Sequence, residues 1–179
     1  EWTTSVGAWL VDAFATCVPE QPVLQLLTGD GTTGAALCAA GTDTISFTGS
    51  TAVGRKVMAS CAAALTPVIL ECGGKDAVLV DADADIAKAV DAVAFGAFSN
   101  AGQTCVGVER AYVHEAVYDQ FVELLAQRAR ELQPGVSYGP MTMPSQVRIV
   151  HDQVADALGR GAVPVVGDAD SATSRVIAP

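Results

Sequence analysis

Two short segments carry side chains that could take part in one reaction. Within residues 68–75, an apolar run leads to Glu71. A Gly-Gly pair follows shortly after and leaves the backbone free to turn sharply. Residues 99–106 place Cys105 shortly after Gly102, which is expected to end a helix. A carboxylate at a strand end and a thiol in a connection are suited to act as general base and nucleophile. We therefore predict that Glu71 and Cys105 are catalytic.

Both side chains need help from their surroundings to react. A free thiol titrates near pH 8.5, roughly, so only a small fraction is thiolate at neutral pH. Glu71 follows three apolar residues, and partial desolvation there would raise its pKa toward the range useful to a base. The usual fate of a free cysteine is that of a small buried apolar side chain, and we keep this interpretation for Cys17, Cys38 and Cys61.

Two glycine-containing turns could approach a phosphate. Residues 29–34 match GxGxxG between a predicted strand and a predicted helix, but no acidic residue ends the next strand as that fingerprint requires. Residues 48–50 open a predicted helix, whose free N–H groups and positive dipole end suit an anion. We favour Thr48, Gly49 and Ser50 for the phosphate over Gly29, Gly31 and Gly34.

Several motifs resemble those of one enzyme family. Glu71-Cys-Gly-Gly-Lys75 resembles the Glu-Leu-Gly-Gly-Lys motif of the NAD(P)-dependent aldehyde dehydrogenase superfamily, and Gly102-Gln-Thr-Cys105 resembles its Gly-Gln-x-Cys nucleophile motif. Phe47-Thr-Gly-Ser-Thr51 is similar to its phosphate-binding turn, and residues 81–85 and 112–115 also fit. The resemblance implies an internal part of a longer enzyme. Residues 1–73 would be the C-terminal part of the NAD(P)-binding domain, and residues 74–179 the N-terminal part of the catalytic domain.

The resemblance also implies a mechanism. Cys105 would attack a small aldehyde to give a thiohemiacetal, hydride transfer to NAD or NADP would leave a thioester, and Glu71 would activate the hydrolytic water. The implied cofactor contacts are Thr48, Gly49, Ser50, Gly29, Gly31, Gly34, Cys72 and Gly73. Other parts of the parent protein, which we expect to be a homo-oligomer, would supply the oxyanion amide and the ribose contacts. The isolated chain is therefore expected to be inactive and prone to aggregate.

The hydrophobic pattern predicts an α/β fold of doubly wound, largely parallel sheets with covering helices. Strands are predicted at 23–27, 44–47, 67–71, 77–80, 108–113 and 163–166. Helices are predicted at 4–18, 35–40, 51–64, from Ile86 to Phe98, from Val117 to Leu132, and at 145–158.

Composition narrows the choice of partners. The net charge of −10, with only 10 Lys and Arg, argues against nucleic acid and anionic membrane surfaces as partners. No apolar run approaches the roughly 18–20 residues that span a bilayer, and no leader pattern is present, so we expect a cytoplasmic protein. The 5 cysteines show no CxxC spacing, which favours reduced thiols over a zinc site or a disulfide framework.

The sequence also allows four alternative interpretations. The DxDxD run at residues 81–85 suggests calcium, but Ile86 and Ala92 stand where an EF-hand loop needs Gly and Glu, so helix capping explains the acids better. A cofactor-free cysteine hydrolase or acyltransferase would need His114 or His151 beside the thiol, and we expect both on the surface. The third alternative is a non-catalytic relative of the family. The fourth is a reversible disulfide between Cys72 and Cys105.

Overall fold

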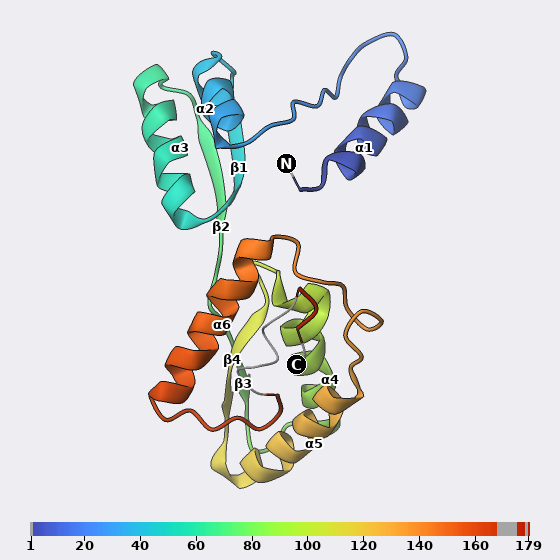
Figure 1. The fold of residues 1–179 in the computed structure, drawn as a ribbon, viewed down its shortest axis with the longest axis vertical. Coiled ribbons are helices and arrows are strands. Elements are labelled where there is room, and N and C mark those ends of the chain that lie inside the picture. Colours follow the sequence, from blue (N-terminus) through green and yellow to red (C-terminus); the bar gives the residue numbers. More distant parts are fainter. Residues whose placement is uncertain (1, 168–174, 178) are drawn as a thin grey trace. The chain divides into compact units, whose positions relative to one another are not determined.

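The computed structural model of the chain describes residues 2–167, 175–177 and 179 (Figure 1). The chain divides into two compact units, Glu1–Cys72 and Gly73–Pro179. We call them the N-terminal unit and the C-terminal unit. Each contains a parallel pair of strands joined through a helix, which is the smallest βαβ arrangement. An α/β fold with parallel strands and covering helices, as the hydrophobic pattern predicts, is thus confirmed.

The N-terminal unit is built around one such pair. Its elements are α1 (Thr4–Cys17), α2 (Gly31–Ala39), β1 (Ile45–Gly49), α3 (Thr51–Ala64) and β2 (Val68–Cys72). Its small core consists of the buried side chains of Cys38, Ile45 and Cys61, against which Val57 and Val68 pack. Because these residues come from α2, β1, α3 and β2, the core fixes both helices against the strand pair.

The segment before α2 differs from the sequence prediction in two ways. Residues 23–27 were predicted to form a strand, but no described strand pairs with them, and an apolar run without a ladder partner does not become β-structure. The covering helix α1 buries none of its residues, and Trp9 is 67% exposed. A Cβ atom added to Gly7 of α1 would lie 3.0 Å from the side chain of Leu26, in the segment predicted as a strand.

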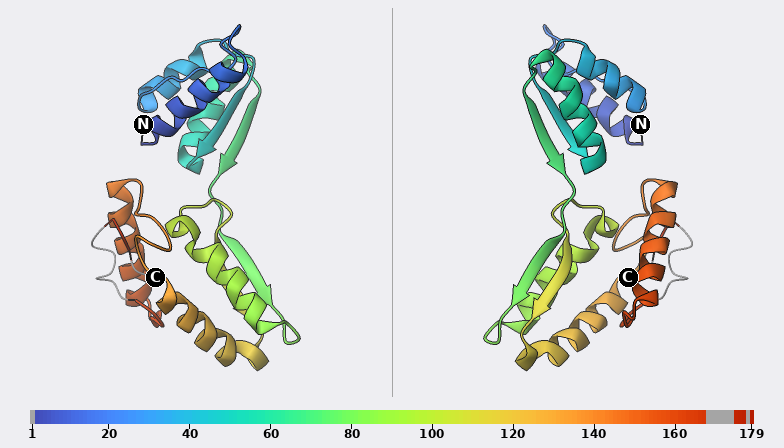
Figure 2. Two further views of the ribbon diagram at one scale, coloured as in Figure 1. Left: turned by 90° about the vertical axis from the view of Figure 1, so that its right-hand side faces the viewer. Right: turned by 90° about the vertical axis from the view of Figure 1, so that its left-hand side faces the viewer.

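The C-terminal unit has the better-defined core. Its elements are β3 (Asp76–Val80), α4 (Ile86–Phe98), η1 (Ser99–Gly102), β4 (Val108–Val113), η2 (Glu115–Val117), α5 (Tyr118–Glu131) and α6 (Pro144–Gly159). The buried side chains of Val80, Val90, Val93 and Phe121 join β3, α4 and α5. Figure 2 shows α4 running beside the β3–β4 pair, with α5 next to it.

Helix starts in both units follow the predicted capping chemistry. Asp85 accepts a hydrogen bond from the Lys88 N–H at 3.2 Å and caps α4, which confirms capping as a role for the last acid of the DxDxD run. The Lys88 side chain, together with this backbone bond, lowers the pKa of the Asp85 carboxyl below its ordinary value. Ser50 caps α3 by accepting from the Val53 N–H at 3.3 Å.

Two further features bear on the predictions. The predicted strand at 163–166 is wrong, because these residues have no β-ladder partner among the described residues. The β-branched residues in this segment have a high β-propensity, but no described strand pairs with them. Across the described part of the chain, no helix combines the length and the apolar character that crossing a bilayer requires.

Candidate active site

Cys105 lies exposed in the turn between η1 and β4. Helix α4 ends at Phe98, and the three residues Asn100, Ala101 and Gly102 then take left-handed backbone conformations, with φ of 54°, 57° and 71°. Only glycine adopts this region without steric cost, so the two preceding residues carry local strain. The sequence prediction that the thiol follows a helix terminated near Gly102, in a connection rather than inside an element, is confirmed.

The side chain of Gln103 fastens this turn in two directions. Locally, the Gln103 amide donates to the Asn100 carbonyl at 2.9 Å, and the Asn100 amide donates to the Gln103 carbonyl at 3.1 Å. At long range, the Thr142 N–H donates to Gln103 Oε1 at 2.8 Å, and the Gln103 amide reaches the Pro140 carbonyl at 3.5 Å. The turn that carries the thiol is therefore tied to residues 140–142.

Residues 140–142 are themselves held by Arg175. Its Nε donates to the Met141 carbonyl at 2.9 Å, and its Nη2 donates to the Thr142 carbonyl at 3.1 Å. The Met141 N–H donates back to the Arg175 carbonyl at 2.6 Å. Sequence reasoning missed this arrangement, because pairings over 30 residues of separation leave no signal in the spacing of one sequence.

The start of the C-terminal unit runs past the same turn. A Cβ atom added to Gly74 would lie 2.8 Å from the Cys105 carbonyl oxygen, so the backbone passes where no side chain fits. Lys75 is ion-paired with Glu109, and Arg110 donates to the Lys75 carbonyl at 2.8 Å. The Gly-Gly-Lys part of the motif is thus anchored to the first residues of β4 and packed against the thiol turn.

Glu71 lies near the end of β2 with its side chain exposed. The predicted partial desolvation is not found in the N-terminal unit. The reason is the alternation of the strand: Val68, Leu70 and Cys72 are half-buried, whereas Ile69 and Glu71 are exposed on the other face. Its register partner on β1 is Thr48. The apolar residues that precede Glu71 therefore do not bury it within this unit.

Cys72 and Gly73 occupy different surroundings. A Cβ added to Gly54 of α3 would lie 3.1 Å from the Cys72 sulfur, so this thiol faces the helix and packs against it. Gly73 is the first residue of the C-terminal unit, and a Cβ added to it would meet nothing within 4 Å. Cys72, like the other four cysteines, is a free thiol.

The N-terminal unit contains a cavity of about 630 Å³ among α2, β1 and α3. Its wall is mostly apolar and includes Gly31, Gly34, Phe47, Val53 and Val57. A Cβ added to Gly31 or Gly34 would meet no atom within 4 Å, so the α2 backbone is open there. No sequence pattern predicts this cavity, because it depends on the packing of two helices.

The GxGxxG run does not form the predicted strand–turn–helix. No strand precedes it, and Gly31 and Gly34 lie within α2 rather than in a loop before the helix. Gly29 alone occupies a special conformation, with φ of 156°, and a Cβ there would overlap the Thr33 side chain. Asp30, not a glycine, caps α2 by accepting from the Thr32 N–H at 2.8 Å.

Residues 48–50 join the end of β1 to the start of α3. β1 ends at Gly49, and the Ser50 hydroxyl caps the 14-residue helix α3 that begins at Thr51. The first N–H groups of a helix point out from its N-terminus and carry partial positive charge. This agrees with the predicted helix at 51–64 and puts an anion-compatible end beside the three residues proposed for a phosphate.

Cys17, Cys38 and Cys61 belong to the N-terminal unit, and the two histidines belong to the C-terminal unit. Cys38 and Cys61 are buried as expected, and burial raises the pKa of the Cys61 thiol, but Cys17 is exposed. His114 follows the far end of β4 from Cys105, and its ring accepts from the Ala116 N–H. A six-residue strand spans about 20 Å, too far for a direct Cys–His pair. His151 lies on α6 beside Asp152.

Together these features define a class: an α/β protein of two parallel βαβ units, with an exposed free thiol in a strained, side-chain-braced turn. The sequence comparison is more specific. The family model described as the aldehyde dehydrogenase family matches residues 1–179. The chain belongs to the aldehyde dehydrogenase family.

Individual relatives are similar over most of this chain. The succinate-semialdehyde dehydrogenase (NADP+) GabD of Escherichia coli (strain K12) is 43% identical over 129 residues, which is 69% of this chain and 27% of that protein. The benzaldehyde dehydrogenase (NAD+) of Pseudomonas putida is 38% identical over 168 residues, or 90% of this chain and 34% of that protein. The chain thus spans about a third of the length of these relatives.

A solved structure supports the same assignment. The crystal structure of lactaldehyde dehydrogenase from Escherichia coli superposes with a TM-score of 0.84 at 33% identity, covering 92% of this chain and 37% of that one. Homologues of this chain are NAD(P)-dependent aldehyde dehydrogenases, and both cofactors occur among them.

Proposed function

We propose that the protein to which this chain belongs oxidises a small aldehyde to a carboxylic acid with NAD or NADP. The observation that carries the proposal is the exposed thiol of Cys105 in a turn whose backbone is strained and whose neighbouring side chain, Gln103, is fully engaged. Strain that is held in place by hydrogen bonds is typical of functional sites. Family membership narrows the chemistry to aldehydes.

Cys105 is the nucleophile of this proposal. Its thiolate adds to the carbonyl carbon of the aldehyde, forming a C–S bond and a thiohemiacetal oxyanion. The backbone N–H of Cys105 donates to that oxygen, with a side-chain amide from elsewhere in the parent protein. Loss of a hydride from the same carbon restores the carbonyl and leaves a thioester on Cys105. The bound NAD or NADP supplies the acceptor for this hydride.

Glu71 is the general base for hydrolysis of the thioester. The carboxylate removes a proton from water, and the resulting hydroxide adds to the thioester carbon. The C–S bond then breaks, which restores the Cys105 thiolate and releases the carboxylic acid. Exposure of Glu71 on its strand leaves the carboxylate available for this task. Covalent geometry also supports the role: Glu71 and Gly74 are three residues apart, so their Cα atoms are never more than about 11 Å apart. Gly74 packs against the Cys105 carbonyl.

The proposed cofactor contacts, apart from Gly73, lie in the N-terminal unit. Thr48, Gly49 and Ser50, at the N-terminus of α3, are proposed to bind the phosphates. The apolar cavity between α2 and α3 fits a planar nucleotide base, because Gly31 and Gly34 leave the helix backbone open to close approach. Gly29, Cys72 and Gly73 then act through backbone shape and packing. The two units accordingly take the roles of cofactor and thiol domains, and the boundary proposed from the sequence, between residues 73 and 74, lies one residue after the boundary between the units.

Compartment and assembly follow as parts of the same proposal. Free thiols in every cysteine suit a reducing cytoplasm. The large exposed apolar side chains of α1, including Trp9 and Phe14, suit burial against other parts of the parent protein or against a second copy in a homo-oligomer. We propose neither a nucleic-acid nor a membrane partner.

The proposal is tested on the intact parent protein. Formation of NADH or NADPH is followed across a panel of aliphatic, aromatic and carboxylated aldehydes, with each cofactor. We expect stoichiometric acid and reduced cofactor for at least one aldehyde and no acid when the cofactor is omitted. Thiol-dependent ester cleavage without any cofactor-dependent aldehyde oxidation would instead support a hydrolase.

A further inference from the structure

We propose that Gln103 is a positioning residue that sets the place of the Cys105 thiol by tying its turn to residues 140–142. This inference rests on the proposed nucleophilic role of Cys105. It concerns a side chain that touches neither the substrate nor the cofactor in the mechanism above.

The turn needs a constraint from outside itself. Asn100 and Ala101 both adopt left-handed backbone, which L-residues with a Cβ avoid, so the relaxed segment would leave this conformation. The reciprocal bonds between Asn100 and Gln103 close the turn locally. They do not fix where the turn lies relative to the rest of the unit.

The long-range bond supplies that position. Gln103 Oε1 accepts from the Thr142 N–H at 2.8 Å, across 39 residues of sequence, and the Gln103 amide spans Asn100 and Pro140. Both ends of the amide group are therefore in use: the oxygen accepts from Thr142, and the nitrogen donates both to the turn and to Pro140. The receiving segment has hydrogen bonds of its own, because Arg175 donates to the carbonyls of Met141 and Thr142.

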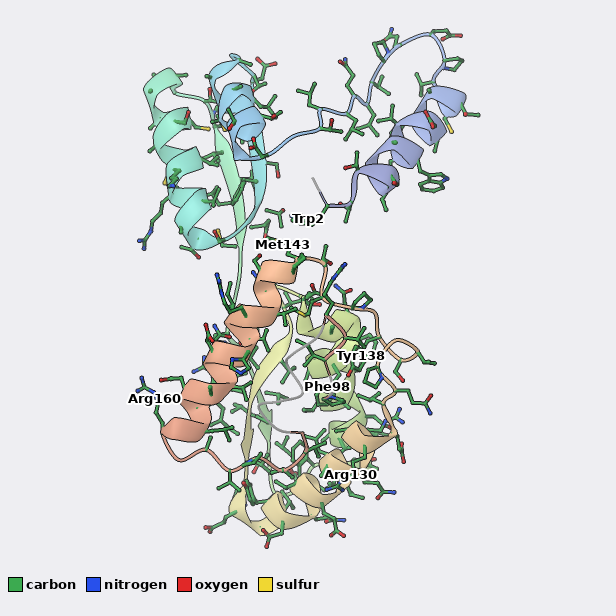
Figure 3. The ribbon with its side chains drawn as sticks, in the orientation of Figure 1. Trp2, Phe98, Arg130, Tyr138, Met143 and Arg160 are labelled. Atoms are coloured by element: carbon green, nitrogen blue, oxygen red, sulfur yellow. The ribbon has the colours of Figure 1, made fainter. Side chains whose placement is uncertain are left out.

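Packing beneath the turn is incomplete, so the hydrogen bonds of Gln103 matter more for the position of the turn. Ala101 and Gly102 form part of the wall of a cavity of about 190 Å³, together with Phe98, Tyr138 and Met141. Figure 3 labels Phe98 and Tyr138, which come from α4 and from the segment after α5. Since side chains do not fill the space under the turn, its position depends on the polar contacts of Gln103.

The effect reaches the thiol through two peptide bonds. The Cα atoms of Gln103 and Cys105 are at most about 7 Å apart, so release of the tether moves the sulfur and the Cys105 N–H together. These are the attacking atom and an oxyanion donor in the proposed mechanism. A misplacement of about 1 Å at such a site lowers the rate by roughly a hundredfold while binding groups elsewhere are unaffected.

The experiment uses Gln103→Ala and the near-isosteric Gln103→Met in the intact parent protein, with Gln127→Ala on the exposed side of α5 as the matched control. The readouts are kcat, KM and the rate at which iodoacetamide alkylates Cys105 between pH 6 and 9. We expect both Gln103 variants to lose about 10–100-fold in kcat, with KM changed less than about threefold. Their alkylation profile should shift, whereas Gln127→Ala should match the parent.

Each outcome decides the matter. A folded Gln103→Met variant with parental kcat and alkylation profile would contradict the proposed positioning role of Gln103. So would loss of the folded state in both Gln103 variants, since that would make Gln103 a general stability residue. Failure of the proposed function is recognised separately: Cys105→Ser would then keep full aldehyde oxidation, while the alkylation profile of the Gln103 variants would still report on the turn.

Discussion

The two catalytic candidates lie in regions that differ in how the structure holds them in place. Glu71 stands on the exposed face of a two-stranded sheet, positioned by backbone register alone. Cys105 lies in a turn that is strained, braced by Gln103 and backed by a segment that Arg175 holds. The difference suggests that the nucleophile must be precisely placed within its own unit, whereas the base needs only to be available at the end of a strand.

The largest expected effect separates the two exposed thiols. We predict that Cys105→Ser lowers aldehyde oxidation by the parent protein about a thousandfold or more, because the hydroxyl is a far weaker nucleophile at neutral pH. Cys17→Ser, at the end of α1, should leave kcat within about twofold. Steady-state assays of both variants test this. Equal activity of the two would remove the distinction between the thiol turn and an ordinary exposed cysteine.

The second prediction concerns the 179-residue chain itself. We expect no aldehyde oxidation from it, because it spans about a third of the length of its relatives and the oxyanion amide of the proposal lies elsewhere. Prolonged assay at high protein concentration, with the intact parent as positive control, gives the measurement. Steady turnover by the isolated chain would show that the two units alone complete the site.

A third prediction compares a buried with an exposed phenylalanine in the C-terminal unit. Phe121 is 2% exposed at the junction of β3, α4 and α5, so Phe121→Ala should cost about 3–5 kcal/mol of unfolding free energy. Phe95→Ala, on a side chain that is 76% exposed, should cost less than about 0.5 kcal/mol in the same 179-residue chain. Urea unfolding of soluble protein followed by circular dichroism compares them. Similar losses for both would contradict the described core.

The fourth prediction addresses the end of α3. Ser50→Ala removes the acceptor for the Val53 N–H, and the loss of such a cap costs about 1 kcal/mol. If residues 48–50 bind the cofactor phosphates, the same variant should also raise the KM for the cofactor more than the KM for the aldehyde. Paired kinetic and unfolding measurements on the parent protein check both effects. Met58→Ala, which changes an exposed side chain of the same helix outside the cavity wall, serves as the control.

The smallest expected effect is a pH dependence at the start of α4. The side chain of Lys88 and, next, its backbone N–H hold the pKa of Asp85 below its ordinary value of 3.8. A lowered carboxyl pKa in the folded state stabilises the fold above pH 3.8, and this contribution is lost as the pH falls through the folded pKa. Asp85→Asn, which keeps a capping oxygen, should therefore show a shallower fall in melting temperature between pH 5 and pH 3. An unchanged slope would refute the assignment.

What the sequence predicted was local in origin. Helix α3 begins and ends where its cap and apolar spacing placed it, and the thiol lies in the predicted connection, because such signals act over a few residues. The strands at 23–27 and 163–166 failed because a strand needs a partner, and no propensity reveals whether one is present. The burial expected for Glu71 failed because sequence neighbours on a strand point to opposite faces.

The parts that escaped prediction depend on distant residues. The bond between Gln103 and Thr142, the support from Arg175 and the cavity between α2 and α3 all arise from packing across tens of residues. In the sequence, Gln103 stands out only as one residue of the Gly102-Gln-Thr-Cys105 motif. A residue that joins two ends of a chain carries no periodic or compositional signature, so a single sequence cannot reveal it.

The central claim is that Cys105 carries the acyl group and that Glu71 releases it. It is tested most directly by the mass of the parent protein after mixing with an aldehyde and its preferred cofactor. For Glu71→Gln, we predict one equivalent of reduced cofactor followed by arrest, with the mass of one acyl group located by peptide mapping on Cys105. Continued turnover of Glu71→Gln at the parental rate, or an acyl group on another residue, would contradict the account.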